Sequence, residues 1–133
     1  MQTLTITTRR REELMSVTAA LQKLCGANGW QDGTLHLHCP HTTAGLTINE
    51  NADPDVTRDM LAALAKLAPP TGDYRHAEGN SDAHVKASLM GPTLTLLVEG
   101  GRILLGTWQG VFFCEFDGPR QRELWVRFAG AND

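Results

Sequence analysis

Two segments of the chain concentrate the short polar side chains that bind metals and phosphates. Residues 41–53 hold a histidine, several hydroxyls, two asparagines and two carboxylates, directly after an apolar run. Residues 75–84 hold a second set that includes His76, Glu78 and His84. Such side chains are costly in a core unless they are hydrogen-bonded, and their density at an element boundary favours a binding site. Both segments are therefore candidates for one shared site.

Three histidines are candidates for a metal centre. His41, His76 and His84 each lie where a predicted regular element meets a polar loop. Three neutral imidazoles with one open position make up catalytic zinc sites, so these residues are the predicted ligands of a divalent metal, with zinc as the expected ion. Their spacing matches no short zinc motif and HExxH is absent, so surface or capping roles stay open. His36 and His38 share one face of a predicted strand and either bind a metal or face solvent.

Polar residues beside these histidines could handle a substrate. Asn49 and Glu50 precede a helix cap that does not account for them, and they could orient a histidine or hold polar groups of a substrate. Thr42 offers a hydroxyl, and Lys86 could contact an anion near the start of a short helix. The candidate catalytic residues are thus His41, Thr42, Asn49, Glu50 and Lys86.

Two later segments could hold the ligand or a cofactor. Residues 106–110 place Trp108 and Gln109 between glycines, which suits a tight turn whose backbone approaches a ligand closely. Trp108 is either a stacking platform or a residue that fills the core. Arg120 follows two carboxylates at a strand end, where a guanidinium suits a phosphate or a salt bridge between subunits. These three are the predicted cofactor- or ligand-binding residues.

The elements that must position these residues follow from apolar spacing and turn signals. Strands are predicted at residues 4–7, 34–39, 44–48, 93–98, 102–105, 110–116 and 124–128. Helical stripes run from Leu14 to Leu24, from Val56 to Leu67 behind an Asp53-Pro54 start, and over residues 84–90. Helices are few and the last third is successive strands. This order predicts an α+β fold with a bent, largely antiparallel or mixed sheet and two main helices.

Composition narrows the class of protein. The 133 residues fit one domain over residues 1–133. A net charge of −3 argues against a nucleic-acid partner. The apolar runs fall far short of the roughly 20 residues that cross a bilayer, and the start is too polar for a secretory signal, so a cytoplasmic protein away from membranes is expected. Cys39 and Cys114 are predicted to be free, inert thiols in apolar strands, with a redox role as the weaker alternative.

Several blocks of the chain together resemble the YjbQ-like family of small bacterial and archaeal proteins. They are HTTAGLTINEN at 41–51 with DPDV at 53–56, HVKASLMG at 84–91 and GTWQG at 106–110, and the likeness covers roughly residues 4–128. The resemblance implies an α+β fold, a homotrimer, metal binding and, in some members, a weak thiamine-phosphate synthase activity. That reaction joins a pyrimidine pyrophosphate to a thiazole phosphate and releases pyrophosphate. By motif match, His41 and His84 carry over as the strongest site residues, with His76, Glu50 and Asn49 behind them.

Two functions follow from these observations. The first is a metal-dependent enzyme that acts on phosphorylated small molecules, as a transferase similar to thiamine-phosphate synthase. Its metal would polarise a phosphate or activate water, and Arg120 or Lys86 would neutralise phosphate charge. The second is a trimeric protein that binds a metal or ligand with the same residues and does not turn it over. The sequence contains no obvious general base with an oriented partner, so both functions stay open.

Overall fold

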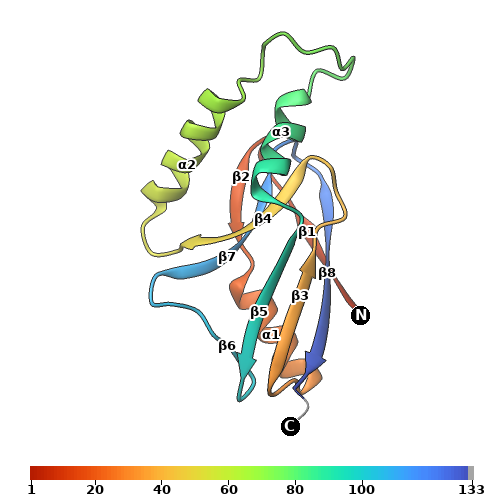
Figure 1. The fold of residues 1–133 in the computed structure, drawn as a ribbon, viewed down its shortest axis with the longest axis vertical. Coiled ribbons are helices and arrows are strands. Elements are labelled where there is room, and N and C mark those ends of the chain that lie inside the picture. The colour runs from red at the N-terminus through yellow and green to blue at the C-terminus, as the bar shows by residue number, and fades with distance from the viewer. Residues whose placement is uncertain (132–133) are drawn as a thin grey trace.

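The computed structural model describes residues 1–131, which have an α+β fold (Figure 1). Along these residues the chain forms, in order, β1 (Gln2–Thr7), β2 (Glu13–Ser16), α1 (Thr18–Asn28), β3 (Gly33–His38), β4 (Ala44–Glu50), α2 (Pro54–Leu67), α3 (Ser81–Met90), β5 (Thr93–Glu99), β6 (Arg102–Ile103), β7 (Gln109–Glu115) and β8 (Gln121–Gly130). The predicted fold class is confirmed.

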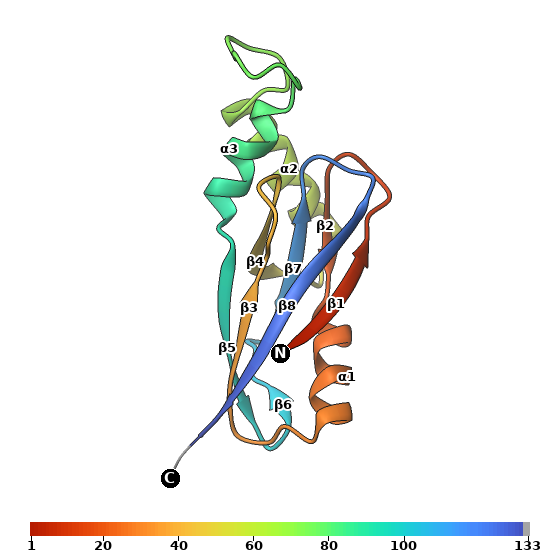
Figure 2. The same cartoon turned by 90° about the vertical axis from the view of Figure 1, so that its right-hand side faces the viewer.

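The strands divide into two stacked sheets instead of one bent sheet. The larger has the order β1-β8-β3-β5-β6 and the smaller β2-β7-β4, and the pairs among the described residues are antiparallel. Figure 2 shows β7 and β4 behind β8 and β3. Leu35, Leu37 and Val126 of the larger sheet meet Leu46 and Phe113 of the smaller one in the main core. Two sheets form because each has an apolar inner face that the other buries.

Strand β7 is buried on both faces, and its outer face forms a second core. Val111 and Phe113 point into the main core, whereas Phe112 and Cys114 pack beneath α2 and α3. Leu64 closes this second core from α2. The two helices therefore cover the smaller sheet only, and the chain is layered as helices, small sheet and large sheet.

The cysteines are free and buried, as predicted. Burial raises the pKa of Cys114 to about 12, so its thiol stays protonated at neutral pH. Burial also raises the pKa of Cys39. Since the thiolate is the reactive form, both sulfurs lie in surroundings that suppress nucleophilic chemistry.

The helix boundaries follow capping signals more closely than apolar stripes. Asp53 caps α2 as predicted, because its Oδ1 accepts a hydrogen bond from the backbone N–H of Asp55 at 2.9 Å. Leu67 ends the predicted stripe but is 73% exposed. The first helix begins at Thr18, not at Leu14, because Leu14 pairs with Cys114 of β7 as part of β2. Pairing with a buried strand outweighs the helical spacing of Leu14.

The outer face of the larger sheet is not covered by any helix of residues 1–131 (Figure 2). Exposed side chains of β3, β5 and β8 lie on this face, and a hollow of about 500 Å³ opens there between His36, His38, Thr95, Trp125 and Arg127. Within the described range, each helix is too short or too polar to span a bilayer.

Several connections meet at one end of the molecule. The β1–β2, β3–β4 and β7–β8 turns lie at the same end, and α3 begins just above them (Figure 2). Residues 41–43 belong to the β3–β4 turn, and residues 76–80 lead into α3. The antiparallel order thus brings the two polar segments of the sequence together.

Candidate functional site

A polar cleft of about 420 Å³ lies at this end of the molecule. Its lining comes from the β3–β4 turn, the segment before α3, α3 itself, the β7–β8 turn and β8: Pro40, His41, Thr42, Thr43, His76, Glu78, Asn80, His84, Asp117, Arg120 and Arg122. The three histidines singled out in the sequence therefore line one cleft, together with Thr42 and Arg120. Whether each performs its predicted role stays a prediction.

A buried ion pair forms the floor of the cleft. Arg122, only 3% exposed, donates from Nε to Oε1 of Glu115 at 2.9 Å and from Nη2 to Oε2 of the same carboxylate. Nη2 also donates to Thr43 Oγ1 at 2.8 Å. Among the described residues Nη1 has no hydrogen-bond partner, and it is not sealed from solvent. The bonds of Nε and Nη2 thus fix the guanidinium group, and the N–H donors of Nη1 stay free at a residue that lines the cleft.

Glu115 is fully buried and accepts hydrogen bonds from several donors. Besides Arg122, these are Thr8 Oγ1 at 2.8 Å and the backbone N–H of Asp117 at 3.0 Å. Burial by itself raises the pKa of Glu115, but the hydrogen bonds and the nearby guanidinium outweigh it and hold this pKa below its ordinary value. The carboxylate thus stays ionised and fixes the orientation of Arg122.

Arg120 forms the rim of the cleft with Asp117 and Asn80. Arg120 donates from Nε to the Asp117 carbonyl at 2.9 Å and from Nη2 to its carboxylate at 3.2 Å. Asn80 Nδ2 donates to the same carboxylate oxygen at 2.7 Å. Asn80 Oδ1 is buried without a partner among the described residues, although asparagine at a helix N-cap usually caps the helix with this oxygen. The Asn80 side chain therefore donates a hydrogen bond to Asp117 and does not cap α3.

The three histidines differ in their surroundings. His76 and His84 face each other, with ring centroids 5.5 Å apart and ring planes at 88°. His41 packs edge-on against Phe113, and its Nε2 accepts a hydrogen bond from the backbone N–H of Glu123 at 2.9 Å. Burial, followed by the charge of Arg122, lowers the pKa of His41. Because Nε2 accepts this hydrogen bond it carries no proton, so the ring is in its neutral form.

The predicted three-histidine metal site does not fit this arrangement. A metal ligand must offer a nitrogen lone pair, and the Nε2 lone pair of His41 is already taken by Glu123. The other nitrogen of a neutral imidazole then carries its hydrogen and cannot ligate. Within residues 1–131, moreover, no three His, Cys, Asp or Glu side chains come together as a metal site.

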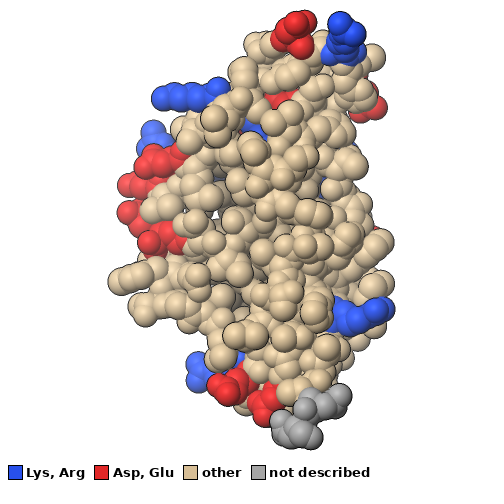
Figure 3. Space-filling model, in the orientation of Figure 1, with Lys and Arg blue, Asp and Glu red and all other residues tan. Residues whose placement is uncertain are grey.

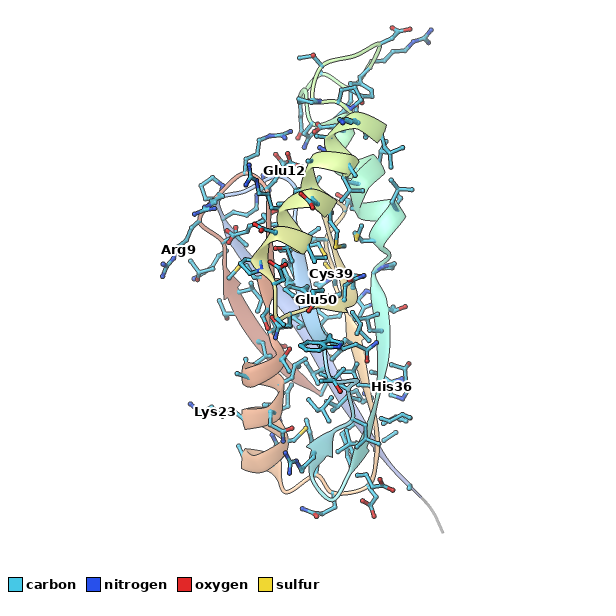
Figure 4. The ribbon with its side chains drawn as sticks, turned by 90° about the vertical axis from the view of Figure 1, so that its left-hand side faces the viewer. Arg9, Glu12, Lys23, His36, Cys39 and Glu50 are labelled. Atoms are coloured by element: carbon cyan, nitrogen blue, oxygen red, sulfur yellow. The ribbon has the colours of Figure 1, made fainter. Side chains whose placement is uncertain are left out.

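Other predicted site residues lie outside the cleft. Lys86 is fully buried, and its Nζ contacts Glu12 at 2.8 Å and Asp82 at 3.1 Å. It stabilises α3 against the β1–β2 turn and has no free donor face for an anion. Glu12 lies near the upper end of the molecule in Figure 4, and Glu50 lies below it, toward the middle.

Asn49, Glu50, Trp108 and Gln109 form a separate group around the β4–β7 ladder. Glu50 pairs with Gln109 in register, and its Oε2 accepts from the backbone N–H of Ala52 at 3.1 Å. Gln109 Oε1 accepts from the backbone N–H of Gly106 at 2.8 Å, and Trp108 is 64% exposed. In this chain these residues shape turns, and the structure does not bring them to the histidines.

The sequence reading missed Arg122 as a site residue, although a signal for it exists. Arg122 alternates in phase with Leu124 and Val126 on the buried face of β8, and Glu115 is likewise in phase with Phe113 on β7. Opposite charges at inward positions of two strands predict a buried pair, because neither could be buried alone.

Comparisons with known proteins identify the family to which the chain is similar. A family model described as "UPF0047 protein YjbQ-like" matches residues 2–131. A UPF0047 protein of Methanocaldococcus jannaschii is 49% identical over 125 residues, which cover 94% of this chain and 91% of the relative. The UPF0047 protein YugU of Bacillus subtilis is 46% identical over 131 residues, which cover 98% and 99%.

Solved structures show the same fold. An uncharacterised YjbQ/UPF0047 protein from Clostridium acetobutylicum has a TM-score of 0.94 at 49% identity, covering 97% of this chain and 100% of its own. A hypothetical protein from Aeropyrum pernix has a TM-score of 0.92 at 33% identity, covering 98% of each chain. Sequence and fold agree over nearly the whole length, and the chain belongs to the YjbQ-like UPF0047 family.

Proposed function

We propose that the protein is an enzyme that binds a phosphorylated small molecule in the cleft. The observation that carries this proposal is Arg122, a buried guanidinium whose Nη1 donors have no protein partner among residues 1–131 and border the cleft. A charge-assisted donor held in place by other bonds is well suited to a phosphate oxygen, since little further ordering is needed on binding.

The rest of the lining supports an anionic ligand of small size. Arg120 uses Nε and Nη2 for Asp117 and has Nη1 to spare among the described residues. The hydroxyl of Thr42 and the rings of His76 and His84 add further polar groups. The volume of about 420 Å³ is that of a small-molecule site.

The specific reaction we propose is the one that the family resemblance implies, a thiamine-phosphate synthase-like transfer. In it, negative charge develops on a leaving pyrophosphate, and fixed donors such as those of Arg122 and Arg120 would stabilise that charge. His76 and His84 are the cleft side chains best suited to moving protons near neutral pH. None of these roles requires a metal.

Replacing Arg122 with lysine is expected to weaken phosphate binding by about tenfold or more. Lysine can keep the ion pair with Glu115 but leaves no fixed donor for the cleft, and a hydrogen bond to a charged group contributes about 1.5–3 kcal/mol. Calorimetric titration with inorganic phosphate and pyrophosphate measures the change. Arg58→Lys, at an exposed position of α2, is the matched control. Equal affinities for wild-type and Arg122→Lys protein would refute the proposal.

Binding without turnover is the second candidate function. It is favoured by His76 and His84: neither ring has a hydrogen-bonded carboxylate among the described residues to orient it as a general base, and the nearest oxygen of Glu78 lies 3.9 Å from His76 Nε2. A condensation assay on the pyrimidine pyrophosphate and thiazole phosphate separates the two functions. Turnover that falls in Arg122→Lys supports the enzyme; tight pyrophosphate binding with no product supports the binding protein.

We also propose that the chain assembles as a homotrimer through the uncovered face of the larger sheet. Figure 3 views the molecule from the side of α3 and β5, where charged side chains lie mostly near the outline. On the sheet face itself, the exposed side chains of β3 and β5 around the hollow include His36, His38 and Thr95, none of them a carboxylate or an amine. Leu97 of β5 is 59% exposed, and Leu89 of α3 is 56% exposed. Large apolar side chains on an uncovered, weakly charged face are typical of a surface that binds another subunit.

Leu97→Glu is expected to dissociate this assembly and leave the subunit folded. The side chain is exposed in the single chain, so the new charge costs little unless a partner covers it. Light scattering after size-exclusion chromatography measures the mass, and circular dichroism checks the fold. Lys66→Glu on α2 is the control. A wild-type protein with the mass of one chain would contradict the trimer.

A further inference from the structure

The hydrogen bond to His41 fixes the position of the hydrogen on its ring. The backbone N–H of Glu123 is a donor and lies 2.9 Å from Nε2. Nε2 must therefore offer a lone pair to accept this hydrogen bond, so it carries no hydrogen. The neutral ring then carries its hydrogen on Nδ1. A metal ligand that uses Nδ1 would need the opposite tautomer, in which Nε2 donates and cannot accept from Glu123.

The surroundings of His41 favour the neutral ring. Burial and Arg122 disfavour a positive charge, whereas the carboxylates of Glu115 and Glu123 favour one less strongly. The remaining charged and titratable groups across the cleft are His76, Glu78, His84, Asp117 and Arg120.

The free nitrogen of His41 remains reachable by a ligand. Nδ1 has no hydrogen-bond partner among the described residues, yet it is not sealed from solvent. His41 lines the cleft and also a neighbouring hollow of about 290 Å³ beside His84 and Ser88. Its edge-on contact with Phe113 restricts rotation of the ring. The Nδ1–H group is therefore a fixed donor that borders the same cleft as Arg122.

We infer that His41 serves the cleft as a neutral Nδ1–H donor to an oxygen of the bound phosphate, and not as a metal ligand or a general base. This inference rests on the proposed phosphate site and deepens it, because it gives His41 one defined role. His41 and Arg122 together would give the phosphate one neutral donor and one buried cation. A neutral donor helps to hold the anion without adding a second buried charge to be compensated.

The tautomer can be tested without any ligand. Long-range ¹H–¹⁵N spectra of histidine side chains distinguish a protonated Nδ1 from a protonated Nε2. The signal of His41 is assigned by its absence from the spectrum of His41→Phe. We expect this signal to show the Nδ1–H form at pH 7.5. An Nε2–H form would overturn the inference, and it is also the form that a metal bound at Nδ1 requires.

Two substitutions test the donor role. An asparagine amide nitrogen lies two bonds from Cβ, as Nδ1 does, whereas a glutamine amide nitrogen lies three bonds away, as Nε2 does. We therefore expect His41→Asn to bind inorganic phosphate within about threefold of wild type, and His41→Gln and His41→Phe to bind it about tenfold more weakly. Circular dichroism and thermal unfolding confirm that each variant is folded.

The outcomes separate this inference from the proposed function. If Arg122→Lys weakens phosphate binding but His41→Gln and His41→Phe do not, the phosphate site stands and the role of His41 is refuted. If wild-type protein does not bind phosphate at all, the proposed function fails, and the spectra still decide the tautomer. Equal weakening in His41→Asn and His41→Gln would also count against an Nδ1–H donor.

Discussion

Replacing Glu115 with alanine is expected to lower the free energy of unfolding by about 3–5 kcal/mol, since it leaves the Arg122 guanidinium buried with no counter-charge. The substitution also removes the acceptor for Thr8 and for the Asp117 backbone, which join the β1–β2 and β7–β8 turns. Urea unfolding at one fixed protein concentration measures the loss, because assembly would add to apparent stability.

The buried pair also predicts which second change should restore stability. Adding Arg122→Met to Glu115→Ala removes the uncompensated charge, so the double variant should be more stable than Glu115→Ala alone. Glu99→Ala, an exposed glutamate on β5, should change stability by less than about 0.5 kcal/mol. A Glu115→Ala protein as stable as the Glu99→Ala control would show that the pair does not hold this end of the fold together.

Acid should remove the same stabilisation in wild-type protein. The pKa of Glu115 is held below its ordinary value of 4.5, so the folded state favours the ionised form. Such a group stabilises the fold fully above its unfolded pKa, and the contribution is lost as pH falls through the folded pKa. The difference between wild type and Glu115→Ala should thus be constant above about pH 5.5 and shrink below about pH 4.5.

Asp82→Ala is expected to destabilise the fold by about 3 kcal/mol. Asp82 is fully buried and binds Lys86, also fully buried, at 3.1 Å and Arg11 at 3.0 Å. Its hydrogen bonds to Arg11 and Lys86 outweigh the effect of burial and lower its pKa. Without Asp82, Lys86 retains only Glu12, and α3 loses the contact of Asp82 with Arg11 in the β1–β2 turn.

A second substitution identifies why Asp82→Ala loses stability. Lys86→Met added to Asp82→Ala fills the same volume without a charge and should recover much of the stability. Asp55→Ala, exposed on α2, is the control for removal of an acidic residue near a helix N-terminus. Equal stabilities for Asp82→Ala and Asp55→Ala by thermal unfolding would contradict a structural role for the Lys86 network.

Local signals in the sequence were enough to predict most elements and several of the residues that line the cleft. The Asp53-Pro54 start of α2 is local capping chemistry and was predicted correctly. The meeting of His41, His76 and His84 follows from polar segments at the ends of neighbouring elements. By contrast, β2 depends on pairing with β7, almost a hundred residues away in sequence, and the spacing of Leu14 gave no sign of it.

The roles of charged residues were harder to predict, because they depend on partners distant in sequence. Lys86 looked like an anion ligand beside His84, but its ammonium is held by Asp82, four residues before it, and by Glu12, 74 residues away. The availability of His41 for a metal depended on one backbone N–H of β8. Residue types indicate which atoms can bind, and only the fold determines which of them are already bound.

The most direct test of the phosphate site is a titration with inorganic phosphate followed by backbone amide spectra. We expect saturable shifts at Thr42, Thr43, His84, Arg120 and Arg122, which line the cleft, and a weaker affinity for phosphate in Arg122→Lys. Shifts confined to His36, His38 and Thr95 on the outer sheet face, or no saturable shifts, would contradict it.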